Sequence, residues 1–387
     1  MDRLVSPQGE FDLERVPVRP KQALRGWDAA DEFVLEDLEA NPLREDAMVV
    51  VIGDSFGSLT CALRDRNPVA INESAAGAEA IAANLARNAL EELEVYSVLD
   101  LETLTDPIDY VVVKIPKSAS ELVDILHRLR PHLHSESRIV GAAMAKHIHS
   151  STIEYFETII GVTSTSLARK KARLIYSTFD YALEAGTNPW PQTWSADAST
   201  LVNHGGGFSP GSIDVGTRFL LANVPSFADL VPGTGEPVRL VDLGCGNGII
   251  GLRAGRDLSD RGINFLLDAV DDSAIALDAG ERSWEATLPG VAAERVAFRQ
   301  HHRLIEVVPK RSVDLVIVNP PFHDDRVVGD DTAWSMFTDS HKVLRPGGSL
   351  LVVGNRHLAY HAKLKKIFGK VDTVASNKKF VLLRAYR

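Results

Sequence analysis

Seven residues, Asp242 to Gly248 (DLGCGNG), have the types and spacing of a loop that brings a ligand close to the backbone. The loop overlaps the end of an apolar run, Val238–Leu243 (VRLVDL), which predicts a buried parallel strand. Glycines let the chain turn sharply, and a helix that starts just beyond the loop would present free N–H groups. The candidate ligand-binding residues of the loop are Asp242, Gly244, Cys245, Gly246, Asn247 and Gly248.

Two ligand classes fit this loop. Gly246, Gly248 and Gly251 have the G-x-G-x-x-G spacing of dinucleotide folds, and Asp271, 20 residues after Gly251, stands where an acid that binds ribose hydroxyls is expected. Asp242 favours the second class, because a carboxylate is unfavourable beside a pyrophosphate but suits an ammonium group. S-adenosylmethionine carries an ammonium group and no phosphate. We therefore predict that Asp242 binds its methionine end and Asp271 its ribose.

A second polar turn, Asn319-Pro320-Pro321-Phe322, follows the apolar run Val313–Val318. Open α/β sheets bind ligands at the carboxyl ends of such strands. Two prolines stiffen the turn and remove two N–H donors. The Asn319 side-chain oxygen and the Pro320 carbonyl could accept both protons of an exocyclic amino group, which favours attack by its lone pair on a methyl group. Phe322 would stack on a planar base, an interaction worth about 1–3 kcal/mol.

Polar residues also flank these two turns. Asp214 and Arg218 belong to a stretch, Phe208–Arg218, that precedes the first strand, and we predict that this stretch covers the cofactor with both residues in contact with it. His323 directly follows the second turn and could handle a proton, although isolated histidines are more often structural.

The elements that must position these turns occur twice along the chain. The first half has apolar runs at Ala47–Gly53 and Tyr110–Ile115, each leading into a turn, as in the second half. Such runs, separated by helical stretches, predict α/β domains with parallel sheets. We predict two tandem Rossmann-like methyltransferase domains, residues 1–190 and 191–387, of which the first is degenerate and the second is catalytic.

Composition places the chain among globular proteins of ordinary type. Of its 387 residues, 45% are hydrophobic and 24% are charged, and the formal net charge is -10. No apolar run is long enough to span a membrane and no export signal opens the sequence, so we predict a cytoplasmic protein. The cysteines, Cys61 and Cys245, lack Cys/His ligand spacing, so no metal site is predicted.

The C-terminal segment reverses the sign of the charge. Residues 356–387 hold nine basic residues and one acid, Asp372, and a smaller basic cluster spans Arg169 to Arg173. Segments of this kind occur on solvated helix faces and on edge strands, where they resist aggregation, and also on faces that contact phosphates. The residues that we expect to contact phosphates are Lys363, Lys365, Lys366, Lys378 and Lys379.

The combination of Asp242–Gly248 with Asn319–Phe322 resembles the class I, Rossmann-like methyltransferases that act on amino nitrogens. The duplicated layout resembles the ribosomal RNA guanine-N2 methyltransferases, and it is more similar to the large-subunit (23S) type than to the small-subunit type. The resemblance covers nearly the whole chain and includes Trp27–Glu32, Lys170–Leu174, Ala333–Phe337, Asn355–Leu358 and Lys363–Gly369.

This resemblance implies an enzyme that transfers a methyl group from S-adenosylmethionine to guanine N2 in large-subunit rRNA, with no obligate protein partner evident. Naked or partly assembled rRNA would be the substrate, because N2 is reached by base flipping or in a single strand. The N-terminal domain of that family lacks the cofactor and is thought to hold RNA. Here Gly53–Gly57 keeps two glycines, and Lys114–Lys117 replaces the second turn with lysines that could meet phosphate.

Other functions stay open at this point. The methylated group could be a guanine N2 of small-subunit (16S) rRNA, a protein glutamine or a DNA adenine, since the last two also use Asn-Pro-Pro-aromatic turns. The chain could be an RNA-binding scaffold with a vestigial cofactor site. A nicotinamide dehydrogenase fits less well, because nothing near Asn319 resembles a hydride-transfer site. The adenine contact is unassigned, since His301–Arg303 occupies its region.

Overall fold

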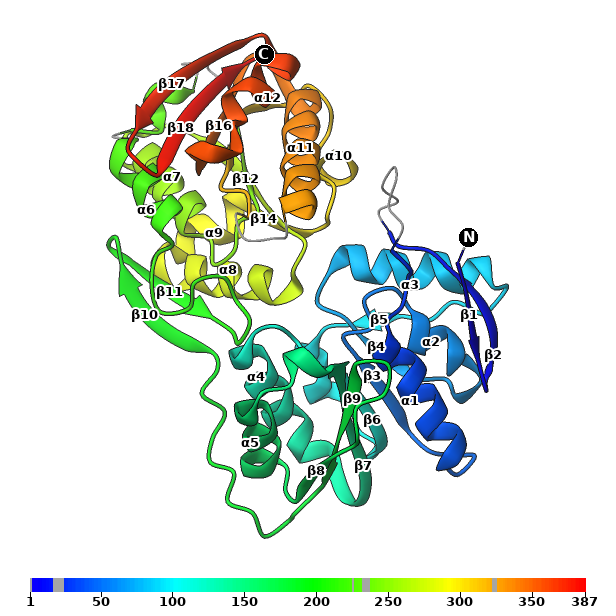
Figure 1. Cartoon of the computed structure of the whole chain (residues 1–387). Helices are drawn as coiled ribbons and strands as arrows, with labels where there is room; N and C mark the ends of the chain where they lie inside the picture. The colour runs from blue at the N-terminus through cyan, green and yellow to red at the C-terminus, as the bar shows by residue number, and fades with distance from the viewer. Residues whose placement is uncertain (1, 17–23, 225, 232–236, 322–325) are drawn as a thin grey trace. The chain divides into compact units, whose positions relative to one another are not determined.

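The computed structural model describes residues 2–16, 24–224, 226–231, 237–321 and 326–387, without the side chains of 2, 292 and 326–330. The chain forms two compact units, Met1–Pro191 and Gln192–Arg387 (Figure 1). Each unit is built around its own seven-stranded sheet. Among the described residues, no helix has both the length and the apolar character needed to cross a membrane.

The first unit begins with a hairpin of two short antiparallel strands, β1 (Asp2–Ser6) and β2 (Gly9–Leu13). The strands of its main sheet are β3 (Val49–Ile52), β4 (Val69–Ile71), β5 (Val95–Tyr96), β6 (Ile108–Lys114), β7 (Leu133–Met144), β8 (Thr163–Thr165) and β9 (Ala172–Thr178). Its helices are α1 (Ala29–Ala40), α2 (Ser58–Ala62), α3 (Ala75–Arg87), α4 (Ala119–Leu129) and α5 (Ser150–Ile159).

The second unit also begins with a hairpin, β10 (Gln192–Ala196) and β11 (Ser199–Asn203). Its main sheet contains β12 (Val238–Leu243), β13 (Phe265–Asp271), β14 (Val296–Gln300), β15 (Val313–Val318), β16 (Leu344–Asn355), β17 (Lys370–Ser376) and β18 (Phe380–Tyr386). Its helices are α6 (Val215–Asn223), α7 (Ile249–Asp260), α8 (Ala274–Thr287), α9 (Pro289–Arg295), α10 (Leu304–Val307), α11 (Arg326–Val343) and α12 (Tyr360–Phe368).

The two sheets have the same topology. Their strand orders are β5-β4-β3-β6-β7-β9-β8 and β14-β13-β12-β15-β16-β18-β17. In both, the first five strands in chain order are parallel and the last strand pairs antiparallel to the fifth. The prediction of two tandem Rossmann-like domains is therefore confirmed.

Helices cover both faces of the second sheet, because its strands are apolar on both sides. Leu240, Leu267 and Leu315 face a core that α6, α7 and α8 complete around Trp284. Val241 and Val316 point to the other face, where Phe337 of α11 and residues of α10 and α12 form a second core. The carboxyl ends of β12 and β15 are paired, so the two candidate turns start at one edge of the sheet.

Strand register shows which residues of the first unit correspond to the candidate site. Ile52 pairs with Val113 as Leu243 pairs with Val318, so Lys114 stands where the second unit has Asn319. The Lys114 side chain is 15% exposed, and its Nζ forms ion pairs with Asp28 at 3.1 Å and with the buried Asp31. The expectation that Lys114 meets phosphate is therefore wrong, because α1 and its N-cap supply two carboxylates to it.

The mid-chain basic cluster is also partly neutralised. Arg169 and Lys170 form ion pairs with Glu36 and Glu32 of α1. Glu32 also lies 3.6 Å from the Arg25 guanidinium, so the acids of α1 meet several cations. These ion pairs join α1 to the segment before β9, which gives the cluster a structural role within the unit.

We expect Lys114→Met to destabilise the first unit by about 3–5 kcal/mol, because it leaves the buried Asp31 carboxylate without its cation. Thermal unfolding followed by circular dichroism measures the loss. Lys117→Met is the matched control, since Lys117 is exposed, and should leave the unfolding temperature unchanged. Equal unfolding temperatures for the two variants would contradict a stabilising role for the Lys114 ion pairs.

Candidate active site

The glycine loop turns sharply directly after β12. Gly244, Gly246 and Gly248 have φ angles of 71°, 53° and 79°, a region that favours glycine. A side chain at Gly248 would also meet Trp284, 3.1 Å from the position of its Cβ, whereas the position at Gly246 opens onto empty space. The loop therefore exposes its backbone at Gly246 and ends at Gly248, the N-cap of α7.

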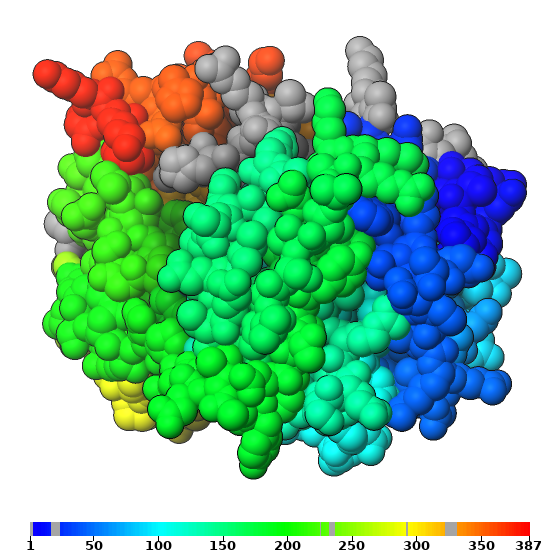
Figure 2. Space-filling model, turned by 60° about the horizontal axis from the view of Figure 1, so that its bottom comes forward, coloured from blue at the N-terminus to red at the C-terminus, as the bar shows by residue number. Residues whose placement is uncertain are grey.

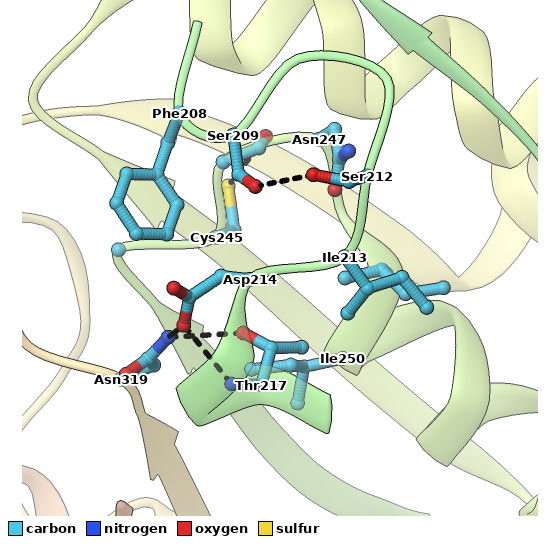
Figure 3. A pocket seen from close by; sticks show the side chains of 13 residues that line it. Phe208, Ser209, Ser212, Ile213, Asp214, Thr217, Cys245, Asn247, Ile250 and Asn319 are labelled. Carbon is cyan, nitrogen blue, oxygen red and sulfur yellow. Dashed lines mark hydrogen bonds between the residues drawn. The ribbon is translucent and has the colours of Figure 1, made fainter. Parts of the chain in front are cut away.

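A pocket lies over this loop, between it and the segment before α6 (Figure 3). Of the predicted site residues it brings together Asp214, Gly244, Cys245, Gly246, Asn247 and Asn319. The other lining residues, which were not predicted as site residues, are Phe208, Ser209, Ser212, Ile213, Thr217, Ile249 and Ile250. Residues separated by 100 positions in sequence therefore line one hollow at the carboxyl edge of the sheet.

Asp242 lies behind the loop and does not line the pocket. Its side chain is buried, and Oδ2 accepts a hydrogen bond from the Gly251 N–H at 2.8 Å in the first turn of α7. Oδ1 is buried and has no hydrogen-bond partner in the part of the chain that the structure describes. Burial raises the pKa of Asp242 to about 7, and the nearby Asp271 adds to this shift.

Asp271, at the end of β13, is hydrogen-bonded to the glycine loop. Its Oδ2 accepts from the Gly246 N–H at 2.9 Å, and its Oδ1 accepts from the Ser273 N–H at 3.0 Å. Burial raises the pKa of Asp271, although these backbone hydrogen bonds favour its charged form. Asp271 therefore sets the shape of the loop in addition to any ligand contact.

Asn319, at the end of β15, has a fixed amide orientation. Its Nδ2 donates to Asp214 Oδ2 at 3.1 Å and to Thr217 Oγ1 at 2.9 Å (Figure 3). Its Oδ1 is buried and has no partner among the described residues. A buried acceptor of this kind requires a donor, and it lies in the wall of a pocket where a ligand could supply one.

Cys245 is buried in the loop, and burial raises the pKa of its thiol. Its Sγ contacts the Gly246 carbonyl oxygen at 3.8 Å. A protonated, buried thiol is a poor nucleophile. Cys245 therefore shapes the pocket wall and is not suited to covalent chemistry.

The remaining predicted residues lie outside the pocket or outside the described residues. Arg218 is exposed on α6 and does not line the pocket. Pro320 is buried and Pro321 half-buried beside Asn319. Phe322 and His323 lie outside the described residues.

Residues 301–303 make structural contacts within the second unit. The His301 and His302 rings stack with centroids 5.1 Å apart, and the His301 backbone N–H donates to the Asp271 carbonyl at 2.9 Å. Arg303 binds the buried Asp339 of α11 with both ends of its guanidinium, at 2.8 and 3.1 Å.

Part of the C-terminal basic segment lies at the same edge of the sheet as the pocket. Asn355 at the end of β16 pairs with Phe380 at the start of β18, which places Arg356, Lys378 and Lys379 beside the carboxyl ends of the parallel strands. All three side chains are exposed, and Figure 2 shows the red C-terminal segment on the surface. Lys370 instead lies towards the opposite edge, where it pairs with Tyr386.

Other basic residues of this segment vary in exposure. Lys365 and Lys366 are exposed on α12, and Lys363 is half-buried over the Tyr360 ring. Arg384 and Arg387 bind main-chain oxygens, those of Leu230 and of Lys342 and Leu344. Both arginines therefore have structural contacts, whereas Lys365 and Lys366 are exposed on the surface of α12.

Acidic and thiol groups do not gather into a metal site within residues 2–16, 24–224, 226–231, 237–321 and 326–387, where no three His, Cys, Asp or Glu side chains are suitably placed.

Models of two protein families match the chain in succession. Residues 1–181 match the RLMG N-terminal domain and residues 198–384 match the methyltransferase small domain. The fold of a T. thermophilus 16S rRNA N2 methyltransferase, solved with AdoMet and guanosine, is similar with a TM-score of 0.74 and 20% identity, over 100% of this chain and 97% of that one. This similarity supports the tandem fold.

Curated relatives match over their full length. "Ribosomal RNA large subunit methyltransferase G" of Streptomyces griseus is 42% identical over 100% of both chains. The protein of that name in Klebsiella pneumoniae is 39% identical over 97% of this chain and 96% of its own. At this identity and coverage, the chain belongs to the ribosomal RNA large subunit methyltransferase G family.

Proposed function

We propose that this chain transfers a methyl group from S-adenosylmethionine to N2 of a guanine in large-subunit rRNA. The observation that carries the proposal is Asn319, whose Nδ2 is held by two side chains and whose Oδ1 has no partner among the described residues, in the wall of a pocket beside a glycine loop. Family membership supports the same reaction, since full-length relatives are named for methylation of large-subunit rRNA.

Asn319 and Pro320 would bind the amino group that is methylated. Asn319 Oδ1 and the Pro320 carbonyl would each accept a hydrogen bond from one N–H of guanine N2. These two hydrogen bonds would direct the N2 lone pair towards the methyl group. The proton that N2 loses on methylation passes to solvent, because neither acceptor is basic enough to take it, so Asn319 and Pro320 act by orientation and electrostatics. Phe322, outside the described residues, is proposed to stack on the base.

The loop is suited to a ligand that carries positive charge and hydrogen-bond donors. Bound S-adenosylmethionine would supply a methyl group on a positively charged sulfur. Asp242 Oδ1 is buried without a partner in the described part of the chain, and it would bind the ammonium group through water, because the carboxylate lies behind the loop. Asp214 lines the same pocket, and Asp271, which accepts from the Gly246 N–H, is proposed to bind the ribose.

The segment Phe208–Ile213 is proposed to move when the cofactor binds. The pocket that it covers measures about 50 Å³, whereas pockets that enclose whole ligands measure roughly 300–1,000 Å³. Phe208 is 51% exposed, and Gly211 has a φ of 72° with open space around it. These features allow the outer part of the segment to open while Ile213 keeps its packing against the core.

RNA is proposed to reach the pocket across the edge that carries Lys378 and Lys379. Positive charge beside the site would hold the phosphates on either side of an unpaired guanine. In the degenerate first unit, a cavity of about 760 Å³ with the exposed Lys117 at its wall lies at the corresponding edge of the sheet, and we propose that this unit contacts RNA without cofactor.

Asn319→Ala should lower kcat about 100-fold or more, as for other single groups that stabilise a transition state. The dissociation constant of S-adenosylmethionine should change less than about twofold, since Asn319 acts on the base. Transfer of tritiated methyl to large-subunit rRNA measures kcat, and calorimetry measures cofactor affinity.

Asn223→Ala is the control for that variant, because Asn223 lies at the other end of α6 and its side chain donates to the Phe219 carbonyl. It should retain wild-type kcat. Equal losses of methyl transfer and cofactor affinity in folded Asn319→Ala would overturn the role assigned to Asn319.

Asp242→Asn should raise the melting temperature of the ligand-free protein at pH 8 more than at pH 5. The pKa of Asp242 is about 7 in the folded state against 3.8 for an ordinary aspartate. The folded protein is therefore destabilised by this side chain increasingly as pH rises from 3.8 through 7, because the buried carboxyl becomes charged. Asparagine imitates the protonated form at every pH. The exposed Asp260→Asn is the control, and a pH-independent difference for Asp242→Asn would contradict the raised pKa.

Lys378→Gln/Lys379→Gln should weaken binding of single-stranded rRNA and lower the slope of log affinity against log salt by about 1.4, for two lost phosphate contacts. Filter binding across a salt series gives the slope. Lys310→Gln/Arg311→Gln removes two exposed cations just before β15, at the opposite edge of the sheet, and should leave the slope unchanged. An unchanged slope in the first variant would refute the proposed RNA face.

A further inference from the structure

We propose that Asp214 and Thr217 are positioning residues that hold the Asn319 amide in the orientation in which its oxygen faces the substrate amino group. This inference rests on the proposed function, in which Asn319 Oδ1 accepts from guanine N2. It adds Thr217 to the reaction and gives Asp214 a second role beside the cofactor.

The Asp214 carboxylate decides which end of the amide points towards it. Oδ2 accepts from the backbone N–H groups of Gly216 and Thr217, at 2.8 and 3.1 Å, and from Asn319 Nδ2 at 3.1 Å. An ionised carboxylate only accepts hydrogen bonds, so the group of Asn319 that faces it must be the NH₂. The opposite orientation would set two oxygens against each other.

Thr217 completes the arrangement by accepting from the same Nδ2 at 2.9 Å. An amide nitrogen has two protons, and Asp214 and Thr217 accept both. The oxygen is then the remaining polar atom of the side chain, and it has no partner among the described residues. The two acceptors thus account for the nitrogen and leave the oxygen for a ligand.

Without these acceptors the amide would turn more freely. The last torsion of asparagine is broad and roughly twofold, so either end can point into a pocket at small cost. An NH₂ group in place of the oxygen could not accept a hydrogen bond from guanine N2, and it would repel the amino group that it faces. A loosened amide would therefore reduce the fraction of bound complexes that can react.

Both positioning residues are themselves well supported. Asp214 is the N-cap of α6, and Thr217 is buried in its first turn (Figure 3). The helix packs against β16, β18 and α7, and Leu220 belongs to the core beneath the sheet. The acceptors are consequently held by a helix, whereas the amide that they orient ends a central strand.

Thr217→Val tests the inference, because valine keeps the shape and removes the acceptor. We expect kcat for methyl transfer to fall about tenfold, while the KM for rRNA and the dissociation constant of S-adenosylmethionine change less than about twofold. Thr217→Ser, which keeps the hydroxyl, should restore most of kcat. Melting temperatures of both variants show whether α6 remains folded.

Asp214→Ser tests the second acceptor in the same assays. Serine is also a good N-cap, so α6 keeps its cap, but its shorter side chain does not reach Asn319. We expect a fall in kcat of about tenfold or more, larger than that of Asp214→Asn, which keeps an acceptor of full length.

The outcomes separate the inference from the proposed function. Wild-type kcat in Thr217→Val, with Asn319→Ala inactive, would overturn the inference and leave the proposed function standing. Equal losses of kcat and cofactor affinity in a folded Thr217→Val, or no rescue by Thr217→Ser, would also overturn it. Wild-type kcat in Asn319→Ala would overturn the proposed function itself.

Discussion

The candidate site depends on the pairing of β12 with β15. Leu243 and Val318 are partners at the carboxyl ends of these parallel strands, so the glycine loop and Asn319 leave the sheet side by side. The strand order reverses at this point, which is where open α/β sheets bind ligands. Asp214, the N-cap of α6, and Thr217, in its first turn, contribute to one wall of the pocket there.

The first unit shows what the same topology does with other residues at these positions. Asn72 occupies the position that Asp271 has in the second unit. Its Nδ2 donates to the Asp54 carbonyl, whereas Asp271 accepts from a loop N–H. The Asp54 carboxylate accepts hydrogen bonds from N–H and hydroxyl groups of Gly57, Ser58 and Thr60. With Asp54 and Lys114 both paired inside the unit, these two positions offer no acceptor like Asn319 Oδ1, so the fold alone does not make such a site.

The sequence was sufficient to predict the sheets and the loop, because these features are local. Apolar runs such as Val313–Val318 indicate buried parallel strands, and the glycines of 244–248 indicate a tight turn wherever they occur. The contact of Thr217 with Asn319 joins residues 102 positions apart, and no local pattern shows it. A weak signal existed, since Thr217 follows Asp214 by one helical turn and so shares its face.

Side-chain direction also lay beyond the sequence. Asp242 points behind the loop because the Gly251 N–H needs an acceptor at the start of α7, and Lys114 turns to acids 86 and 83 positions earlier. Arg218 lies two positions from the buried Gly216, on the exposed side of α6. In each case packing around the residue determines its direction.

The most direct measurement is a crystal structure of the protein with S-adenosylhomocysteine and a short single-stranded RNA that contains the target guanine. Our account predicts that Asn319 Oδ1 lies about 2.7–3.2 Å from guanine N2, while Nδ2 keeps its bonds to Asp214 and Thr217. A complex in which N2 lies beyond hydrogen-bond reach of Oδ1, or in which the Asn319 amide is reversed, would contradict it.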